Sequence, residues 1–236
     1  STQIASELLV KHYRWGYKSN VYSLKDIHIT LYAMQTAARM AIISYSQSRI
    51  ACGVYRVKNS KKNVKTWHRK EADVNRLIPE PSLHELYYLA LEELFASCFK
   101  IARLAKEWNS FEKLDNGLFF NEEFVFKSRT AVSGYLLHFN TLTYDDFLKD
   151  MSTTPFTEKP EILISEASKS FQSAKEALQR YMKASGVKNA EIQQMLRCIV
   201  TNSLFLRNFN PNVKIKVSYE NHFLWPIFEV VANPQS

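Results

Sequence analysis

Glycine is scarce in this chain, and its residues never cluster. The five glycines stand at positions 16, 53, 117, 134 and 186 of 236 residues. Loops that cradle phosphate need neighbouring glycines, because only glycine lets the backbone approach the ligand closely. The sequence contains neither a GxGxxG fingerprint nor a P-loop, and it lacks the Arg/Gln-x-x-Gly-x-Gly/Ala loop with which acetyltransferases hold acetyl-CoA. We therefore expect no cofactor in this chain.

Cysteine is also sparse, since only Cys52, Cys98 and Cys198 are present. Their odd number and wide spacing argue against a disulfide framework, and the absence of a CxxC pair argues against a zinc site. We expect buried free thiols in a reducing compartment. The six histidines are solitary in the sequence. The sequence therefore predicts no metal site and no catalytic residues.

No segment has the pattern of a signal peptide or a membrane span. The chain opens STQIASELL without an initiator Met or an apolar leader, which indicates a piece of a longer protein. The most apolar stretch, residues 27–45, carries His28, Gln35 and Arg39. Charge near the middle of a span is costly, so this stretch predicts a buried helix. We expect a cytoplasmic protein that has no membrane partner.

Apolar residues at three-and-four spacing predict most of the chain to be helical. Ser82-Leu-His-Glu85 is a capping box, Ser23-Leu-Lys-Asp26 has the same spacing, and Asn189 can cap a further helix. Gly186 is suited to end a helix in the left-handed conformation. The predicted long helices cover residues 23–49, 82–108, 161–185 and 189–204. Between residues 109 and 160 we expect a short helix or two, one of them capped at Thr143-Tyr-Asp-Asp146, and irregular chain.

The pattern changes near the carboxyl end. Residues 213–219, VKIKVSY, alternate apolar and polar side chains, and FLWPIFEVV follows at 223–231. Two such runs around a short connection predict an antiparallel β-hairpin over 211–232. Pro226 then belongs at an edge or a bulge, because it donates no ladder hydrogen bond. The predicted fold class is mainly α, with one irregular multi-helix scaffold over residues 1–236 and this small hairpin on its surface.

Basic charge is concentrated in the first third of the chain. Residues 1–76 hold 14 Lys and Arg against 4 Asp and Glu, whereas residues 77–236 hold 17 against 19. The stretch RVKNSKKNVKTWHRK, residues 56–70, supplies seven of these cations and lies in a predicted linker over 56–81. Two interpretations are open, a solvated linker and a surface for nucleic-acid phosphate. The predicted polyanion-binding residues are Lys58, Lys61, Lys62, Lys65, Arg69 and Lys70.

Several segments resemble the carboxy-terminal part of a known family. ILISEASKSFQSAKEAL, residues 162–178, is similar to the family's Ala-Ser-Lys-x-Phe-x-x-Ala-Lys run. His222-Phe-Leu-Trp-Pro226-Ile-Phe-Glu-Val-Val231 is similar to its terminal segment. The order of a helix opened by GYKSNVYSLKD, a lysine-rich linker and an aromatic-rich helix also matches. The family is the large auxiliary subunit of the NatC N-terminal acetyltransferase, and the similarity runs from Leu8 to Val231.

This resemblance implies a helical, non-catalytic scaffold. Its partners would be a catalytic acetyltransferase subunit, which uses acetyl-CoA, and a small Sm-like auxiliary subunit. The complex would acetylate nascent chains that begin with Met and a hydrophobic residue. From its local concentration of charge, we expect the basic stretch 56–70 to contact ribosomal RNA. Two other interpretations stay open: an independent helical RNA-binding module, and an enzyme whose catalytic residues meet only in the tertiary structure.

Overall fold

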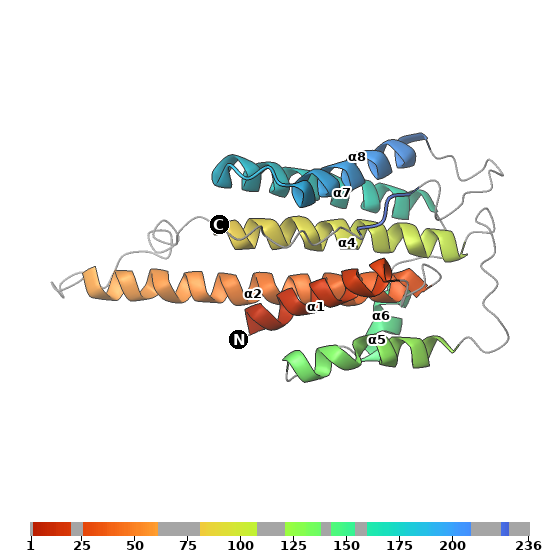
Figure 1. Ribbon diagram of the computed structural model, residues 1–236, viewed down its shortest axis with the longest axis horizontal. Helices are drawn as coiled ribbons and strands as arrows, with labels where there is room; N and C mark the ends of the chain where they lie inside the picture. Colours follow the sequence, from red (N-terminus) through yellow and green to blue (C-terminus); the bar gives the residue numbers. More distant parts are fainter. Residues whose placement is uncertain are drawn as a thin grey trace.

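A computed structural model describes residues 2–19, 26–60, 81–107, 121–137, 143–153, 160–208 and 223–226. Within these ranges the chain is mainly helical and has no β-strand. The helices there are α1 (Thr2–Lys18), α2 (Ile27–Ser60), α4 (Leu83–Glu107), α5 (Glu122–Leu137), α6 (Tyr144–Thr153), α7 (Pro160–Ser185) and α8 (Ala190–Asn208) (Figure 1).

Helix α4 lies at the centre of the body, between α2 on one side and α7 on the other (Figure 1). Helix α1 packs on α2, α8 packs on α7, and α5 contacts both α1 and α2. Leu91, Leu94, Phe95 and Cys98 of α4 have no exposed surface. The wide apolar stripe of this helix is therefore covered from more than one side.

Helix α7 buries one face along α4, and that face contains the run that carries the family resemblance. Leu163, Ala167, Phe171, Ala174 and Leu178 recur at intervals of three and four residues and are all buried. Such spacing places side chains on one side of a helix. The small side chains of Ala167 and Ala174 permit close approach of the α4 backbone. The resembling run is thus part of the core.

Local capping signals explain where several helices begin and end. The Ser82 backbone N–H donates to Oε2 of Glu85 at 2.7 Å, and the Glu85 N–H donates to Ser82 Oγ at 3.2 Å, which confirms the capping box. Asn189 accepts from the Ile192 N–H at 2.9 Å at the start of α8. Gly186 follows α7 with a φ of 69°, a conformation that side chains with a Cβ rarely adopt.

The capping carboxylate of Glu85 also joins α4 to α2. Ser46 Oγ donates to its Oε1 at 2.6 Å, and Arg49 Nε lies 3.0 Å from its Oε2. Burial by itself would raise the pKa of Glu85. The hydrogen bonds from Ser46, Ser82 and Arg49 outweigh burial, so the pKa lies below its ordinary value of 4.5.

Two predicted boundaries are wrong. Helix α2 continues to Ser60, beyond the predicted end at Arg49, so the first five residues of the predicted linker 56–81 are helical. Asp26, assigned by its spacing to the first turn, precedes α2 and accepts a hydrogen bond from Arg129 of α5 at 2.6 Å. Helix α1 has no counterpart among the predicted helices. The four-residue spacing of Ala5, Leu9, Tyr13 and Tyr17, all buried, is the signal that identifies it.

The predicted β-hairpin over 211–232 is not supported. Residues 223–226 are described, and they form no strand. The backbone N–H of Leu224 donates to Asn202 Oδ1 at 2.9 Å, and Asn202 Nδ2 donates to the Leu224 carbonyl at 2.8 Å. Because a helix side chain satisfies both backbone groups, Leu224 needs no partner strand. The predicted strand 213–219 and residues 227–231 lie outside the described residues.

The three cysteines are free, and two of them are buried as predicted. Cys98 of α4 and Cys198 of α8 both lie near Asn202, whose Nδ2 is 3.9 Å and 3.6 Å from their sulfurs. Cys52 of α2 is exposed, so the prediction is wrong there. Among the helices described, none combines the length and the apolar character that crossing a membrane requires.

Candidate functional site

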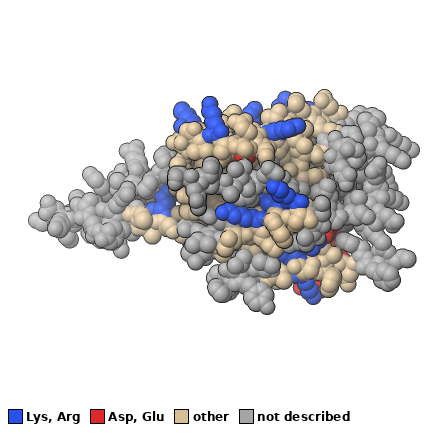
Figure 2. Space-filling model, viewed as in Figure 1, with Lys and Arg blue, Asp and Glu red and all other residues tan. Residues whose placement is uncertain are grey.

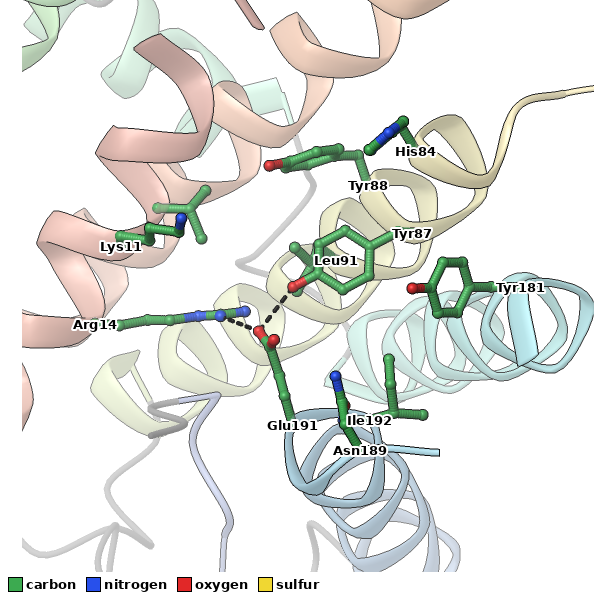
Figure 3. A pocket seen from close by; sticks show the side chains of 11 residues that line it. Lys11, Arg14, His84, Tyr87, Tyr88, Leu91, Tyr181, Asn189, Glu191 and Ile192 are labelled. Atoms are coloured by element: carbon green, nitrogen blue, oxygen red, sulfur yellow. Dashed lines mark hydrogen bonds and ion pairs between the residues drawn. The ribbon is translucent and has the colours of Figure 1, made fainter. Parts of the chain in front are cut away.

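A cavity of about 290 Å³ lies where α1, α4, α7 and α8 meet (Figure 3). This volume is just below the range of roughly 300–1,000 Å³ that is typical of small-molecule sites. It therefore suits a small ligand or an inserted side chain. The lining residues are Val10, Lys11, Arg14, His84, Tyr87, Tyr88, Leu91, Tyr181, Asn189, Glu191 and Ile192.

Helix geometry brings these side chains together. Lys11 and Arg14 are three residues apart on α1, so they point to the same side of that helix. His84, Tyr87, Tyr88 and Leu91 of α4 occupy positions i, i+3, i+4 and i+7, which form a single face. These side chains converge on the first turn of α8, where Asn189 caps the helix (Figure 3).

An ion pair between Arg14 and Glu191 closes one side of the cavity. Arg14 is only 3% exposed, and its Nη1 donates to Glu191 Oε1 at 2.5 Å. The Tyr87 hydroxyl donates to the same oxygen at 2.7 Å, so three helices meet at one carboxylate (Figure 3). Glu191 also lies in the first turn of α8, where the helix dipole favours negative charge.

Protonation at this contact is set mainly by burial. Burial raises the pKa of Tyr87 most strongly, Arg14 lowers it by less, and the Glu191 carboxylate raises it again. Tyr87 therefore stays protonated at neutral pH and acts as a hydrogen-bond donor. The positive charge of Arg14 is balanced by Glu191, whereas Lys11 forms no ion pair with any described residue. The cavity carries one excess positive charge.

Aromatic rings form the other walls. The ring centroid of Tyr87 is 5.3 Å from that of Tyr88 and 5.7 Å from that of Tyr181. His84 stacks on Tyr45 of α2 at 4.9 Å. Aromatic pairs at these separations stabilise one another beyond simple burial, so the walls are held in place. The arrangement offers an apolar floor, hydroxyl groups and one unbalanced ammonium group, which are features of a binding site.

The structure does not bring the predicted polyanion-binding residues into this cavity. Lys58 lies near the end of α2, and its side chain is not described. The remaining predicted residues, Lys61, Lys62, Lys65, Arg69 and Lys70, lie outside the described residues. Their role stays a prediction. In the part of the chain that the structure describes, no group of three or more His, Cys, Asp or Glu side chains is placed to hold a metal ion.

A second basic surface, which no run of Lys and Arg in the sequence signals, lies on α7 and α8. Five exposed cations lie along α7, α8 and the connection between them, and none forms an ion pair with a described residue. Figure 2 shows Lys and Arg side chains along the edge of the molecule where these helices lie. Between residues 176 and 208 the acidic residues are Glu176, which accepts a hydrogen bond from Gln172, and Glu191, which is turned toward Arg14. This α7–α8 basic surface consists of Arg180, Lys183, Lys188, Arg197 and Arg207.

Comparison with known proteins gives no match, whether with protein-family models, curated proteins or solved structures.

Proposed function

We infer that this chain is a non-catalytic scaffold subunit of a NatC-type N-terminal acetyltransferase. The observation that carries the proposal is the position of the two resembling segments. The run at 162–178 lies on α7 and packs along α4, and residues 223–226 are held on α8 by Asn202. Residues 162–178 and the described residues 223–226 therefore contribute to the packing of the helical body, where a scaffold family would share a sequence pattern.

On this proposal the chemistry belongs to the partners. A catalytic subunit binds acetyl-CoA and acetylates nascent chains that begin with Met and a hydrophobic residue. A small Sm-like subunit completes the complex, which works in the cytoplasm near the ribosome. The chain described here supplies surfaces, and its cavity serves to bind a partner rather than acetyl-CoA.

Co-expression of the full-length protein with the catalytic and small subunits tests the proposal. We expect both subunits to elute with the tagged protein at high salt, because a permanent complex buries a large apolar area that salt does not weaken. The eluted complex should acetylate peptides that begin Met-Leu. Elution of the tagged protein by itself would contradict the proposal, and so would micromolar binding of acetyl-CoA to this chain in calorimetry.

The basic stretch 56–70 is proposed to anchor the complex to ribosomal RNA. Replacing Lys61, Lys62 and Lys65 with Glu should lower ribosome co-sedimentation at low salt and leave acetylation of free peptides unchanged. If about five phosphates are neutralised, the slope of log affinity against log salt is about −3.5 to −4.5. A matched triple reversal of exposed Lys127, Lys149 and Lys169, which belong to neither basic surface, is the control and should leave co-sedimentation unchanged. Unchanged co-sedimentation of the first variant would show that the stretch is a solvated linker.

An independent RNA-binding module is the second candidate function. The α7–α8 basic surface favours it, because its five exposed cations outnumber Glu176 and Glu191, the acidic residues of positions 176–208, and clustered cations attract phosphate. On this alternative the tagged protein brings down RNA that nuclease or high salt removes, and the acetyltransferase is absent. The same purification therefore separates the two candidates.

A further inference from the structure

Helix α1 exposes two large apolar side chains on one face. Trp15 is 59% exposed and Leu8 is 46% exposed. They are seven residues apart, two helical turns, so they lie on the same side of the helix. Lys11 lies between them and is also exposed. These three residues form the α1 stripe. Tryptophan is among the residues that contribute most to protein interfaces, so this stripe is a candidate contact surface.

The α1 stripe is continuous with the cavity described above. Lys11 belongs to both, because its side chain also lines the cavity, as Arg14 does (Figure 3). Lys11, His84 and Asn189 are exposed and form the rim, whereas Leu91 and Ile192 are buried below them. A partner segment that binds along α1 and contacts Trp15 would therefore lie beside the cavity, and it could insert one of its side chains there.

Charge indicates what kind of segment fits. Glu191 balances Arg14 inside the cavity, and Lys11 at the rim forms no ion pair with any side chain that the structure describes. A carboxylate beside the inserted side chain would pair with the Lys11 ammonium group. RNA fits less well, because a phosphate backbone gains little from Leu8 and Trp15 and finds more cations on the α7–α8 basic surface.

We propose that the α1 stripe and the adjoining cavity dock an acidic segment of a partner subunit, with one apolar side chain inserted into the cavity and a carboxylate on Lys11. This inference rests on the proposed function, because it places the segment in the acetyltransferase complex. Helix α1 is a rigid base for such a contact, since Leu9 and Tyr13 on its opposite face are buried and the Tyr13 hydroxyl donates to the Arg129 carbonyl at 3.1 Å.

The test uses the full-length protein co-expressed with its catalytic and small subunits, and it measures the affinity between subunits. Trp15→Ser should weaken binding of one subunit by about thirtyfold, the loss expected at a central interface residue. Lys11→Glu should weaken binding of the same subunit by about tenfold, more at low salt than at high salt. Both side chains are exposed, so the thermal unfolding midpoint should not change.

Two matched variants control for general effects of surface substitution. Phe124→Ser removes an aromatic side chain of α5 that is 70% exposed. Lys169→Glu reverses an exposed charge on α7. Neither residue belongs to the α1 stripe or the cavity, so both variants should bind all subunits as the wild type does.

The outcomes separate this inference from the proposed function. If the wild-type protein binds neither subunit, the proposed function fails and the docking site fails with it. If the wild type binds and Trp15→Ser and Lys11→Glu bind equally well, the docking site is wrong and the proposed function stands. A photocrosslinking benzoylphenylalanine in place of Leu8 gives a second measurement. A crosslink to a partner segment that contains Asp or Glu supports the proposal, whereas a crosslink to RNA or to a segment without acidic residues overturns it.

Discussion

Replacing Asn202 with Leu should release the carboxy-terminal segment from α8. Asn202 has no exposed surface, and its amide makes two hydrogen bonds to the backbone of Leu224 at 2.8 and 2.9 Å. Leucine has a similar shape but makes neither bond. The Leu224 carbonyl still accepts a hydrogen bond from the Cys198 thiol at 2.9 Å, whereas the Leu224 N–H loses Asn202 Oδ1 as its acceptor. An unsatisfied backbone group costs about 1–3 kcal/mol and a lost hydrogen bond about 1 kcal/mol, so we expect a loss of about 2–4 kcal/mol.

Chemical denaturation measures the free energy of unfolding, and hydrogen exchange of a peptide containing residues 223–226 measures the local contact. The variant should exchange the Leu224 amide faster than the wild type. Asn208→Leu is the matched control, because Asn208 is exposed on the same helix and bonds only to the Leu204 carbonyl of its own turn. That control should change stability by less than about 0.5 kcal/mol. Equal unfolding free energies for the two variants, with unchanged exchange at Leu224, would refute the reasoning.

Two further outcomes follow from the titratable groups. The pKa of Glu85 is lower in the folded chain than its ordinary 4.5, so the stability it provides is present above that pH and is lost as the pH falls through the lower folded value. Glu85→Gln should therefore destabilise the protein at neutral pH and flatten the fall in thermal midpoint below about pH 4.5. A maleimide should label exposed Cys52 in the native protein and reach buried Cys98 and Cys198 only after unfolding, and fast labelling of all three would contradict the packing.

The elements that sequence reasoning identified correctly are those with local signals. The Ser82–Glu85 box, the Asn189 cap and Gly186 each act within a few residues of themselves, and all three lie at helix ends. The apolar periodicity of a helix is likewise a local signal, because it depends on residues three and four positions apart. The predicted end of α2 at Arg49 is wrong. No helix-stop signal stands there, and the helix continues to Ser60.

No local sequence signal indicates the candidate site. Arg14 and Glu191 are 177 residues apart, and Tyr87 reaches the same carboxylate across 104 residues. The alternation in the carboxy-terminal residues suggested a strand partner, whereas the actual partner of Leu224 is one buried amide 22 residues away on a helix. Contacts of this kind depend on how helices pack, and periodicity within one helix does not determine which partner its polar side chains meet.

The net charge summed along a stretch of sequence does not give the charge of the surface that its residues form. Residues 77–236 are slightly acidic in total, which conceals the cations of α7 and α8. Helix α7 itself carries Glu161, Glu166 and Glu176, and other carboxylates lie on different helices: Glu122 and Glu123 begin α5, and Asp145 and Asp146 begin α6, where helix dipoles favour them. Because the Debye length is about 8 Å at physiological salt, the carboxylates of α5 have little effect on an anion that binds at α8. A binding partner therefore responds to the local charge of the helix face that it contacts. For this reason a basic surface can form outside the first third of the chain, although residues 77–236 are slightly acidic in total.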